Sequence, residues 1–496
     1  MKRKLTAWLL SGVMALTMAA GLAAPVMASE EDQAAADNVA AMIDAIYVQE
    51  RTEETDAQCA AAKEAWDALT DAQKELVEGE SADPDYFGRD TGDASLDDPR
   101  NGDGIGEKEL LVVSFGTSFN DSRAADIGGI EAALAAAYPD WAVRRAFTAQ
   151  IIINHVQARD GEYIDNMDQA LQRAVNNGVK NLVVQPTHLM QGAEYDELCA
   201  AVEANAGNFE SVQIAKPLLG DVGEDATIVN EDKATVAKAL TAQAVADAGY
   251  ASLEDAAADG VAFVFMGHGT AHAAAVTYDQ MQTQMQELGY GNVYIGTVEG
   301  EPEDTECSAV IAKIQADGYK KVILRPLMVV AGDHANNDMA GDEEDSWKSM
   351  FLASGAFESV DCQIAGLGRI PEIQQVYVAH TAAVMGGEQA APAAEAPAAE
   401  AAPAAEAAPA AEPAPAAEAP AAEPAPAAEP APAAEPAPAA EPAPAAEPAP
   451  AAEPAPAAEA PAPPAVDPGA GIEQTIACDT GEVIDTIVID EYGNMQ

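Results

Sequence analysis

Basic side chains are scarce in this chain of 496 residues. Lysine and arginine together number 24, against 83 aspartates and glutamates, so the formal net charge is -59 at pH 7. A chain of that sign repels phosphate, which argues against nucleic acid or an anionic membrane as a partner. Much of the charge lies in a repetitive tract near the C-terminus, so it says little about the part of the chain that folds.

Aromatic residues and cysteines are also few. Aromatics make up 5% of the chain, and together with the repetitive tract this indicates that not all of it is globular. The five cysteines are scattered without a C-x-x-C spacing, so neither a zinc knuckle nor a redox pair is expected. The sequence has no G-x-x-x-x-G-K-[ST] loop, which agrees with chemistry that needs no nucleotide.

The first 28 residues have the composition of an export signal. Basic residues at positions 2–4 precede an apolar run at 7–22, and Val26 and Ala28 supply the small residues of a cleavage site. We expect a signal peptide at 1–28 and an exported protein, extracellular or associated with the cell envelope. An uncleaved membrane anchor is the alternative. No later segment approaches the roughly 18 continuous apolar residues that a membrane-spanning helix requires.

Two segments of different character follow the export signal. Residues 30–82 are rich in alanine at helical spacing, which predicts a small helical module that we interpret as a spacer or adaptor. Residues 83–108 are polar and rich in glycine and aspartate, which predicts a linker. Positions 101–104 resemble a calcium loop, but Leu110 stands where such a loop ends in glutamate.

The chain after residue 387 is dominated by repeats of Glu-Pro-Ala-Pro-Ala-Ala. Residues 388–467 lack the apolar surface needed for a core and their glutamates repel one another, which predicts a disordered spacer. At about 3.1 Å per residue in polyproline conformation, such a spacer would extend on the order of 200 Å. Residues 468–496 are too short to fold alone, and their role is not assigned.

The central region alternates short β-branched runs with amphipathic segments, as expected for parallel α/β sheets. Eight runs predict two sets of four strands: 110–115, 142–147, 182–186 and 212–215, then 261–266, 293–298, 322–327 and 363–367. The motifs at 114–117 and 266–270 follow corresponding strands and echo each other. We therefore expect two similar lobes, 109–230 and 231–387, each a four-stranded parallel sheet flanked by helices, with ligands bound between them.

Four of the six histidines follow predicted strands, namely His188, His268, His272 and His334. His268 lies between two glycines, which let the chain turn sharply and leave the imidazole open to a ligand. Taken singly, Glu299 has a plain explanation as a solvated strand-end residue and His334 as part of a helix-capping loop. Two imidazoles and a carboxylate from three adjacent strand ends nevertheless suit Co²⁺, Fe²⁺, Ni²⁺ or Zn²⁺.

Residues 110–385 resemble the anaerobic sirohydrochlorin cobaltochelatase family, a branch of the ATP-independent class II chelatases. The segments that carry the resemblance are 111–118, 145–148, 188–195, 265–269, 331–340 and 345–348. The resemblance places the family's metal ligands on His268, Glu299 and His334. It implies that His268 is also the base that deprotonates the pyrrole nitrogens. We expect further contacts to a tetrapyrrole substrate from these residues: Ser114, Thr117, Thr148, His188, Glu194 and His272.

The resemblance implies an enzyme, a lyase that inserts a divalent metal without ATP. We expect cobalt as the metal and sirohydrochlorin or a related tetrapyrrole as its acceptor, as in anaerobic cobalamin biosynthesis. The export signal supports a second hypothesis, an exported haem-, tetrapyrrole- or metal-binding protein for uptake without turnover, and a surface adhesion or structural module is a third. The three candidate ligands favour the enzyme, because a haem binder needs only one or two axial ligands.

Overall fold

The computed structural model describes residues 29–87 and 92–386, and the backbone of 472–477 and 483–489. The predicted signal peptide at 1–28 and the predicted spacer at 388–467 lie outside these ranges. The described residues fall into two compact units, one ending before residue 403 and the other beginning there. The second unit contains a two-stranded antiparallel sheet of β9 (Ile472–Ala477) and β10 (Val483–Ile489). No helix within the described ranges has both the length and the apolar character needed to cross a bilayer.

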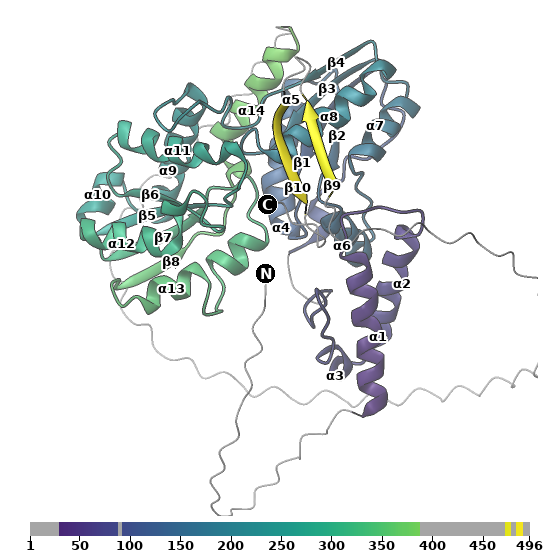
Figure 1. Ribbon diagram of the computed structural model, residues 1–496, viewed down its shortest axis with the longest axis horizontal. Coiled ribbons are helices and arrows are strands. Elements are labelled where there is room, and N and C mark those ends of the chain that lie inside the picture. The colour runs from purple at the N-terminus through teal and green to yellow at the C-terminus, as the bar shows by residue number, and fades with distance from the viewer. Residues whose placement is uncertain (1–28, 88–91, 387–471, 478–482, 490–496) are drawn as a thin grey trace, which may run out of the picture. The chain divides into compact units, whose positions relative to one another are not determined.

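The first lobe is built on a parallel sheet with the strand order β2-β1-β3-β4 (Figure 1). Its strands are β1 (Lys108–Ser114), β2 (Ala142–Phe147), β3 (Asn181–Pro186) and β4 (Ser211–Ile214). Successive side chains of a strand point to opposite faces of its sheet, and β1 follows this rule. Leu110 and Val112 join a core with α5 (Gly128–Ala137), whereas Leu111 and Val113 join one with α7 (Met167–Asn176) and α8 (Ala193–Asn205). Both faces of the sheet are therefore covered, as parallel sheets require.

The second lobe repeats this topology with the order β6-β5-β7-β8. Its strands are β5 (Val261–Gly267), β6 (Val293–Thr297), β7 (Lys321–Pro326) and β8 (Ser359–Cys362). The prediction of two four-stranded parallel sheets is confirmed. The eighth strand lies earlier than the predicted 363–367, because Ser359–Cys362 pair in register with Lys321–Leu324 of β7.

The remaining helices connect and cover these strands. They are α4 (Asn120–Ser122), α6 (Gln150–Asp160), α9 (Glu231–Asp247), α10 (Leu253–Ala258), α11 (Val276–Glu287), α12 (Cys307–Asp317), α13 (Trp347–Ala353) and α14 (Pro371–Val384). Two π-helical turns, Arg123–Ile127 and Ala335–Met339, interrupt the loops after β1 and β7. Such turns are rare and occur often at functional sites.

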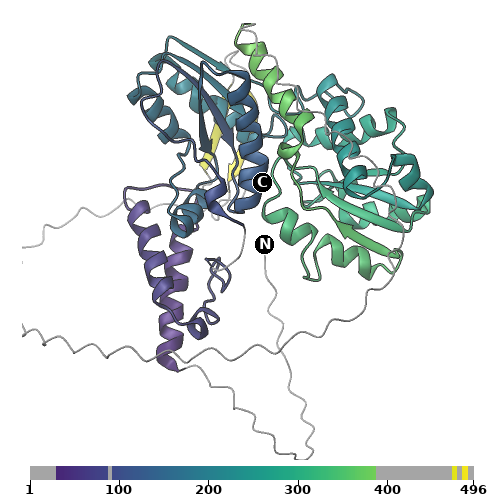
Figure 2. The same cartoon turned by 180° about the vertical axis from the view of Figure 1, so that it is seen from behind.

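The last helix, α14, follows the second sheet in sequence but packs against α5 and β3 of the first lobe (Figures 1 and 2). The hydroxyl of Tyr377 donates a hydrogen bond to the Thr187 carbonyl at 2.8 Å, and the hydroxyl of Thr381 donates to the Gln185 side chain at 2.7 Å. A continuous apolar cluster joins both sheets through α9 and α14. This cluster and the α14 contacts connect the two lobes.

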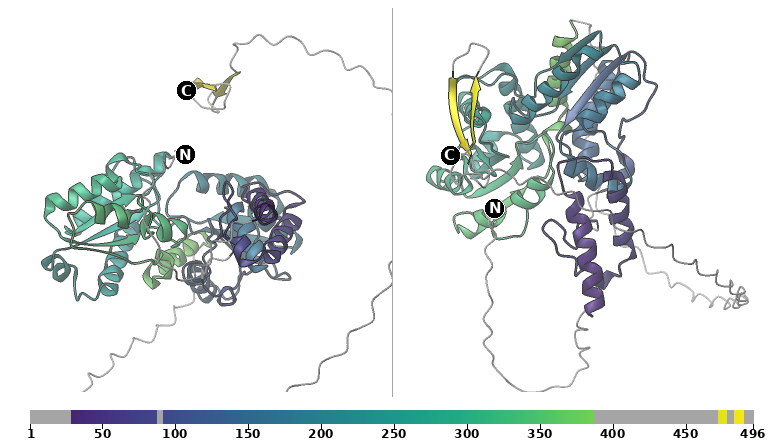
Figure 3. Two further views of the ribbon diagram at one scale, coloured as in Figure 1. Left: turned by 90° about the horizontal axis from the view of Figure 1, so that it is seen from below. Right: turned by 45° about the vertical axis from the view of Figure 1, so that its right-hand side comes forward.

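The N-terminal helices have a core of their own and also contact the first lobe. They are α1 (Glu30–Ile46), α2 (Thr55–Ala68) and the short α3 (Asp71–Lys74). Val39, Ile43, Cys59 and Trp66 are buried between them. The helix pair α1 and α2, drawn in purple in Figure 3, packs against α6. The segment predicted as a helical module is thus fixed to the first lobe.

Candidate metal centre

His268 stands directly after β5, where the chain turns at two glycines. Gly269 has a φ of +95°, and a Cβ there would lie only 2.9 Å from the Cβ of Glu299. A glycine is required here, because its lack of a side chain permits both this φ and the close approach of the next loop. The backbone N–H of Glu299 donates a hydrogen bond to the His268 carbonyl at 2.9 Å. Two of the three expected ligands are therefore joined through their backbones.

His334 lies at the start of the π-helical turn after β7 and faces His268. The two ring centroids are 4.6 Å apart, and the rings meet edge to face at 83°. Nδ1 of His334 donates to the Asp338 carboxylate at 2.6 Å, and Nδ1 of His268 is 2.8 Å from the Gly269 carbonyl. Because these oxygens can only accept, each Nδ1 carries a proton, and in the neutral ring the Nε2 lone pair is free for a metal.

The electrostatic surroundings of His334 favour a positive charge. Its pKa is raised chiefly by the hydrogen bond to Asp338, against the opposing effect of burial, and the charges of Asp338, Asp333 and Glu299 add to the increase. The same negative charges attract a cation to the loop. Sequence reasoning missed Asp338, although its position four residues after His334 is the spacing at which side chains meet on a helical turn.

Among the described residues, Glu299 is joined to His268 by its backbone, and its side chain forms no hydrogen bond or ion pair with either imidazole. Its side chain is exposed on the turn after β6. Within the described ranges, no group of three His, Cys, Asp or Glu side chains has an arrangement that could hold a metal ion. The structure therefore brings His268 and His334 together, and the assignment of all three residues as ligands stays a prediction.

Three of the expected substrate contacts lie at the carboxyl end of the first sheet. The buried hydroxyls of Ser114 and Thr187 are 2.6 Å apart, so Ser114 is engaged within the protein. Thr117 is buried, and its hydroxyl oxygen would lie 3.1 Å from a Cβ at Gly332, so the loops after β1 and β7 nearly touch there. The hydroxyl of Thr148 is buried and has no hydrogen-bond partner.

The other three lie where the loop after β3 approaches the second lobe. The side chain of His188 is 7% exposed, its Nε2 is 3.5 Å from the Glu194 carboxylate, and neither ring nitrogen is hydrogen-bonded. Burial lowers the pKa of His188 to about 4 and raises that of Glu194. Nε2 of His272 is 3.5 Å from the Asp196 carboxylate, and both residues line a cavity of about 500 Å³ formed by the two lobes.

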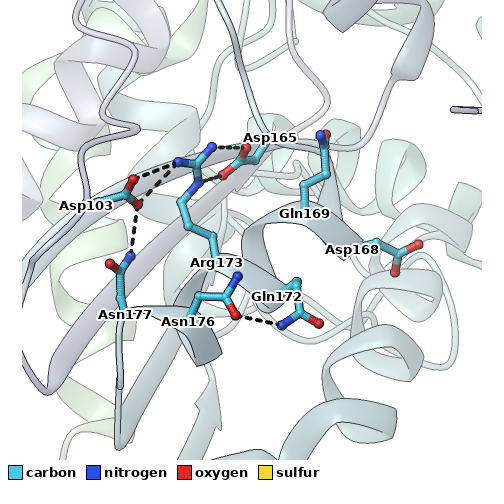
Figure 4. A pocket seen from close by; sticks show the side chains of 8 residues that line it. All are labelled: Asp103, Asp165, Asp168, Gln169, Gln172, Arg173, Asn176 and Asn177. Atoms are coloured by element: carbon cyan, nitrogen blue, oxygen red, sulfur yellow. Dashed lines mark hydrogen bonds and ion pairs between the residues drawn. The ribbon is translucent and has the colours of Figure 1, made fainter. Parts of the chain in front are cut away.

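A separate polar cavity of about 710 Å³ lies beside α7 (Figure 4). Arg173 is one of the residues that line it, and its guanidinium is bound by Asp165 at 2.6 and 2.8 Å and by Asp103 at 3.3 Å. Since two carboxylates already neutralise this arginine, the cavity offers no free cation for an acidic ligand. None of the expected site residues is among the side chains that line it.

Comparisons with known proteins agree on the central region. A model of the family described as cobalt chelatase (CbiK) matches residues 108–386. The sirohydrochlorin cobaltochelatase of Salmonella typhimurium is 36% identical over 274 residues, which cover 55% of this chain and 95% of that protein. The sirohydrochlorin cobaltochelatase CbiKC of Nitratidesulfovibrio vulgaris is 31% identical over 251 residues, which cover 50% of this chain and 81% of that protein. The structure of SirB from Bacillus subtilis with Fe³⁺ is 15% identical, with a TM-score of 0.39 over 57% of this chain and 99% of that one.

Proposed function

This chain belongs to the cobalt chelatase family, and from that membership we propose that residues 108–386 insert Co²⁺ into sirohydrochlorin without ATP. The observation that carries the proposal is the facing pair of His268 and His334, with ring centroids 4.6 Å apart at the carboxyl ends of two neighbouring strands. This is the edge of a parallel sheet at which ligands bind. In this proposal the metal is a substrate, passed from the protein to the macrocycle.

The binding step uses groups that the fold already positions. The two Nε2 lone pairs of His268 and His334 take up Co²⁺, and rotation about the side-chain bonds of Glu299 adds its carboxylate. Two nitrogen ligands and one oxygen ligand form a borderline site that keeps coordination positions open for the incoming macrocycle. Fe²⁺, Ni²⁺ and Zn²⁺ suit the same ligands, and the choice of cobalt rests on the names of the related enzymes.

The insertion step must remove two protons, because a neutral macrocycle loses two pyrrole protons when its nitrogens bind a divalent metal. As Co²⁺ moves to the macrocycle, Nε2 of His268 is released and accepts one of these protons. A neutral imidazole is suited to this role near pH 7. Glu299, exposed and joined to His268 by a backbone hydrogen bond, accepts the second proton and transfers it to water.

The proposal also places the reaction outside the cytoplasm. Its support is the composition of residues 1–28, with cleavage expected after Ala28. The mature chain would then begin at Ser29, whose side chain accepts a hydrogen bond from the Asp32 N–H at 3.0 Å and caps α1. N-terminal sequencing of the chain recovered from outside the cell tests this point, and an intact Met1 in that fraction would contradict cleavage.

The decisive experiment is anaerobic mixing of the purified chain with sirohydrochlorin and Co²⁺, followed by absorbance. We expect insertion well above the uncatalysed rate, and a loss of at least about 100-fold in His268→Ala, as for removal of a general base. His380→Ala is the matched control, because His380 lies in α14, where its ring contacts the Lys216 backbone carbonyl and the Asp232 carboxylate. A wild-type rate equal to the uncatalysed one contradicts the proposal, and tight haem binding without turnover would support the uptake hypothesis instead.

A further inference from the structure

The C-terminal end of α1 is fixed against the first turn of α6, at the carboxyl end of the first sheet. The side-chain amide of Asn154 donates a hydrogen bond to the Ile46 carbonyl at 2.9 Å. The backbone N–H of Gln150 donates to the side chain of Gln49, also at 2.9 Å. Asn154 is completely buried, so the first of these bonds is shielded from water. Residues 46–49 are thus anchored at the edge of the sheet where ligands bind.

The same end of α1 is held from a second direction by Asp44. Its carboxylate accepts hydrogen bonds from the backbone N–H groups of Glu80, Ser81 and Ala82, at 3.0, 2.8 and 3.0 Å. A Cβ at Gly79 would collide with this carboxylate, so a glycine is needed for the approach. The corner that follows α1 therefore has a defined position instead of being a loose connection.

Three large apolar side chains are exposed around this corner, namely Tyr47 at 43%, Val48 at 41% and Phe115 at 46%. Phe115 belongs to the loop after β1, and its carbonyl accepts the N–H of Ala149, the N-cap residue of α6. Within the described ranges eight large apolar side chains are exposed to this degree, and three of them gather at one end of α6. A cluster of this kind marks a contact surface.

The second lobe approaches this corner through the loop that carries His334, which meets the loop after β1. Burial raises the pKa of the Tyr47 hydroxyl, and the negative charge of Asp333 raises it further. The loops after β1 and β7 also approach each other, as shown by the contact of Thr117 with Gly332. The corner at Tyr47 and the Phe115 loop therefore meet at the first turn of α6, and the Phe115 loop continues to Thr117, beside the loop that carries His334.

We propose that Tyr47, with Val48 and Phe115 beside it, forms an apolar wall that contacts the tetrapyrrole macrocycle, which makes the helical module part of the substrate site. The inference rests on the proposed chelatase function and deepens it. A macrocycle is flat and largely apolar, so its face or edge packs well on aromatic side chains while its carboxylates stay in water. Tyr47 and Val48 precede residue 108, where the family match begins, so this part of the wall is an addition to the family region.

The test compares the full chain with Tyr47→Ala at saturating Co²⁺ and varied sirohydrochlorin. We expect the apparent KM for sirohydrochlorin to rise about tenfold, as for loss of one good aromatic contact, with kcat changed less than about twofold. Tyr47→Phe keeps the ring and should stay within about twofold of wild type. Binding of sirohydrochlorin, followed through its fluorescence without metal, should weaken by the same factor in Tyr47→Ala.

The matched control is Tyr163→Ala, since Tyr163 is 57% exposed but follows the opposite end of α6. It should leave both constants unchanged. Equal KM and equal sirohydrochlorin binding for wild type and Tyr47→Ala would contradict the proposed contact with the macrocycle. A loss of Co²⁺ binding in Tyr47→Ala would also contradict it. If the wild type inserts no metal, the proposed function fails by itself. The fluorescence titration then still decides whether Tyr47 contacts the macrocycle.

Discussion

The carboxylate of Asp338 accepts a hydrogen bond from Nδ1 of His334 over 2.6 Å. The two residues are four positions apart in the loop after β7, and the pair holds the imidazole edge to face against His268. A carboxylate in this position fixes the tautomer of the ring and makes Nε2 a stronger ligand. The orientation of the His334 ring therefore depends on Asp338, which is not one of the expected metal ligands.

Replacement of Asp338 should weaken cobalt binding. Asp338→Ala leaves Nδ1 of His334 without its acceptor, and we expect Co²⁺ affinity to fall about 10- to 100-fold in a calorimetric titration. Asp338→Asn keeps an oxygen acceptor, and its Co²⁺ affinity should lie between those of Asp338→Ala and the wild type. Asp342→Ala is the control, because Asp342 is exposed and pairs only with Lys348 on the same loop. Equal affinities for wild type and Asp338→Ala would contradict the expected role.

Stability should fall in mild acid because of His188. Burial lowers the pKa of His188 to about 4 in the folded protein, from an ordinary value of 6.5. The unfolded chain therefore binds this proton first as the pH falls. Neutral His188 therefore lowers the free energy of unfolding as the pH falls from about 6.5 to 4, and has no such effect above pH 6.5. At pH 5 the free energy of unfolding is lower by about 2 kcal/mol. Urea unfolding at pH 7.5 and pH 5 should show this loss, and His188→Gln should reduce it. An identical loss in the variant would exclude His188 as its source.

The contact between the lobes should depend on Asp126. This fully buried carboxylate in the first lobe accepts the Ala331 N–H at 3.0 Å and pairs with Nε of Arg369 at 2.6 Å. Asp126→Ala leaves both donors unpaired, and we expect the free energy of unfolding to fall by about 3 kcal/mol or more. Asp140→Ala, at an exposed position, should change it by less than about 0.5 kcal/mol. Thermal unfolding distinguishes the two, and equal midpoints would contradict the inference.

A side chain at Gly269 should disturb the loop that carries His268. Alanine is strained at a φ of +95°, and its Cβ would press against Glu299 and Thr297. We expect Gly269→Ala to cost about 1–3 kcal/mol of stability and to weaken Co²⁺ binding. Gly289→Ala also has a positive φ but meets no atom within 4 Å, so it controls for backbone strain alone. If both variants bind Co²⁺ equally well, the close approach of the two loops is not needed for binding.

The sheets could be predicted from sequence because their signal is local. Runs such as 110–115 and 261–266 are continuous and apolar, and strands buried on both faces need no other pattern. Glycines around His268 likewise indicated a sharp turn at a strand end. The pairing of His268 with His334 followed from topology, since neighbouring parallel strands end at the same edge of a sheet.

The missed features depend on contacts between distant segments. Asn154 meets Ile46 across 108 positions and Tyr138 meets Val378 across 240, and neither pair leaves a local pattern in the sequence. For this reason the sequence alone suggests an adaptor for the helical module and does not predict the return of α14 to the first lobe. Asp338 is hard to recognise for a different reason, because a carboxylate in a polar loop has the sequence pattern of any solvated residue.

The return of α14 to the first lobe determines how the fold would respond to a mechanical pull. Tension applied to the chain at residue 386 enters through α14, where Tyr377 and Thr381 are bonded to the end of β3. The load then passes into the first sheet, whose central strand β1 pairs with neighbours on both sides. The strand ends that carry His268 and His334 belong to the other sheet, which α14 reaches through α9, where His380 pairs with Asp232. A pull at that end of the domain would therefore load both lobes through one helix, the first directly and the second through α9.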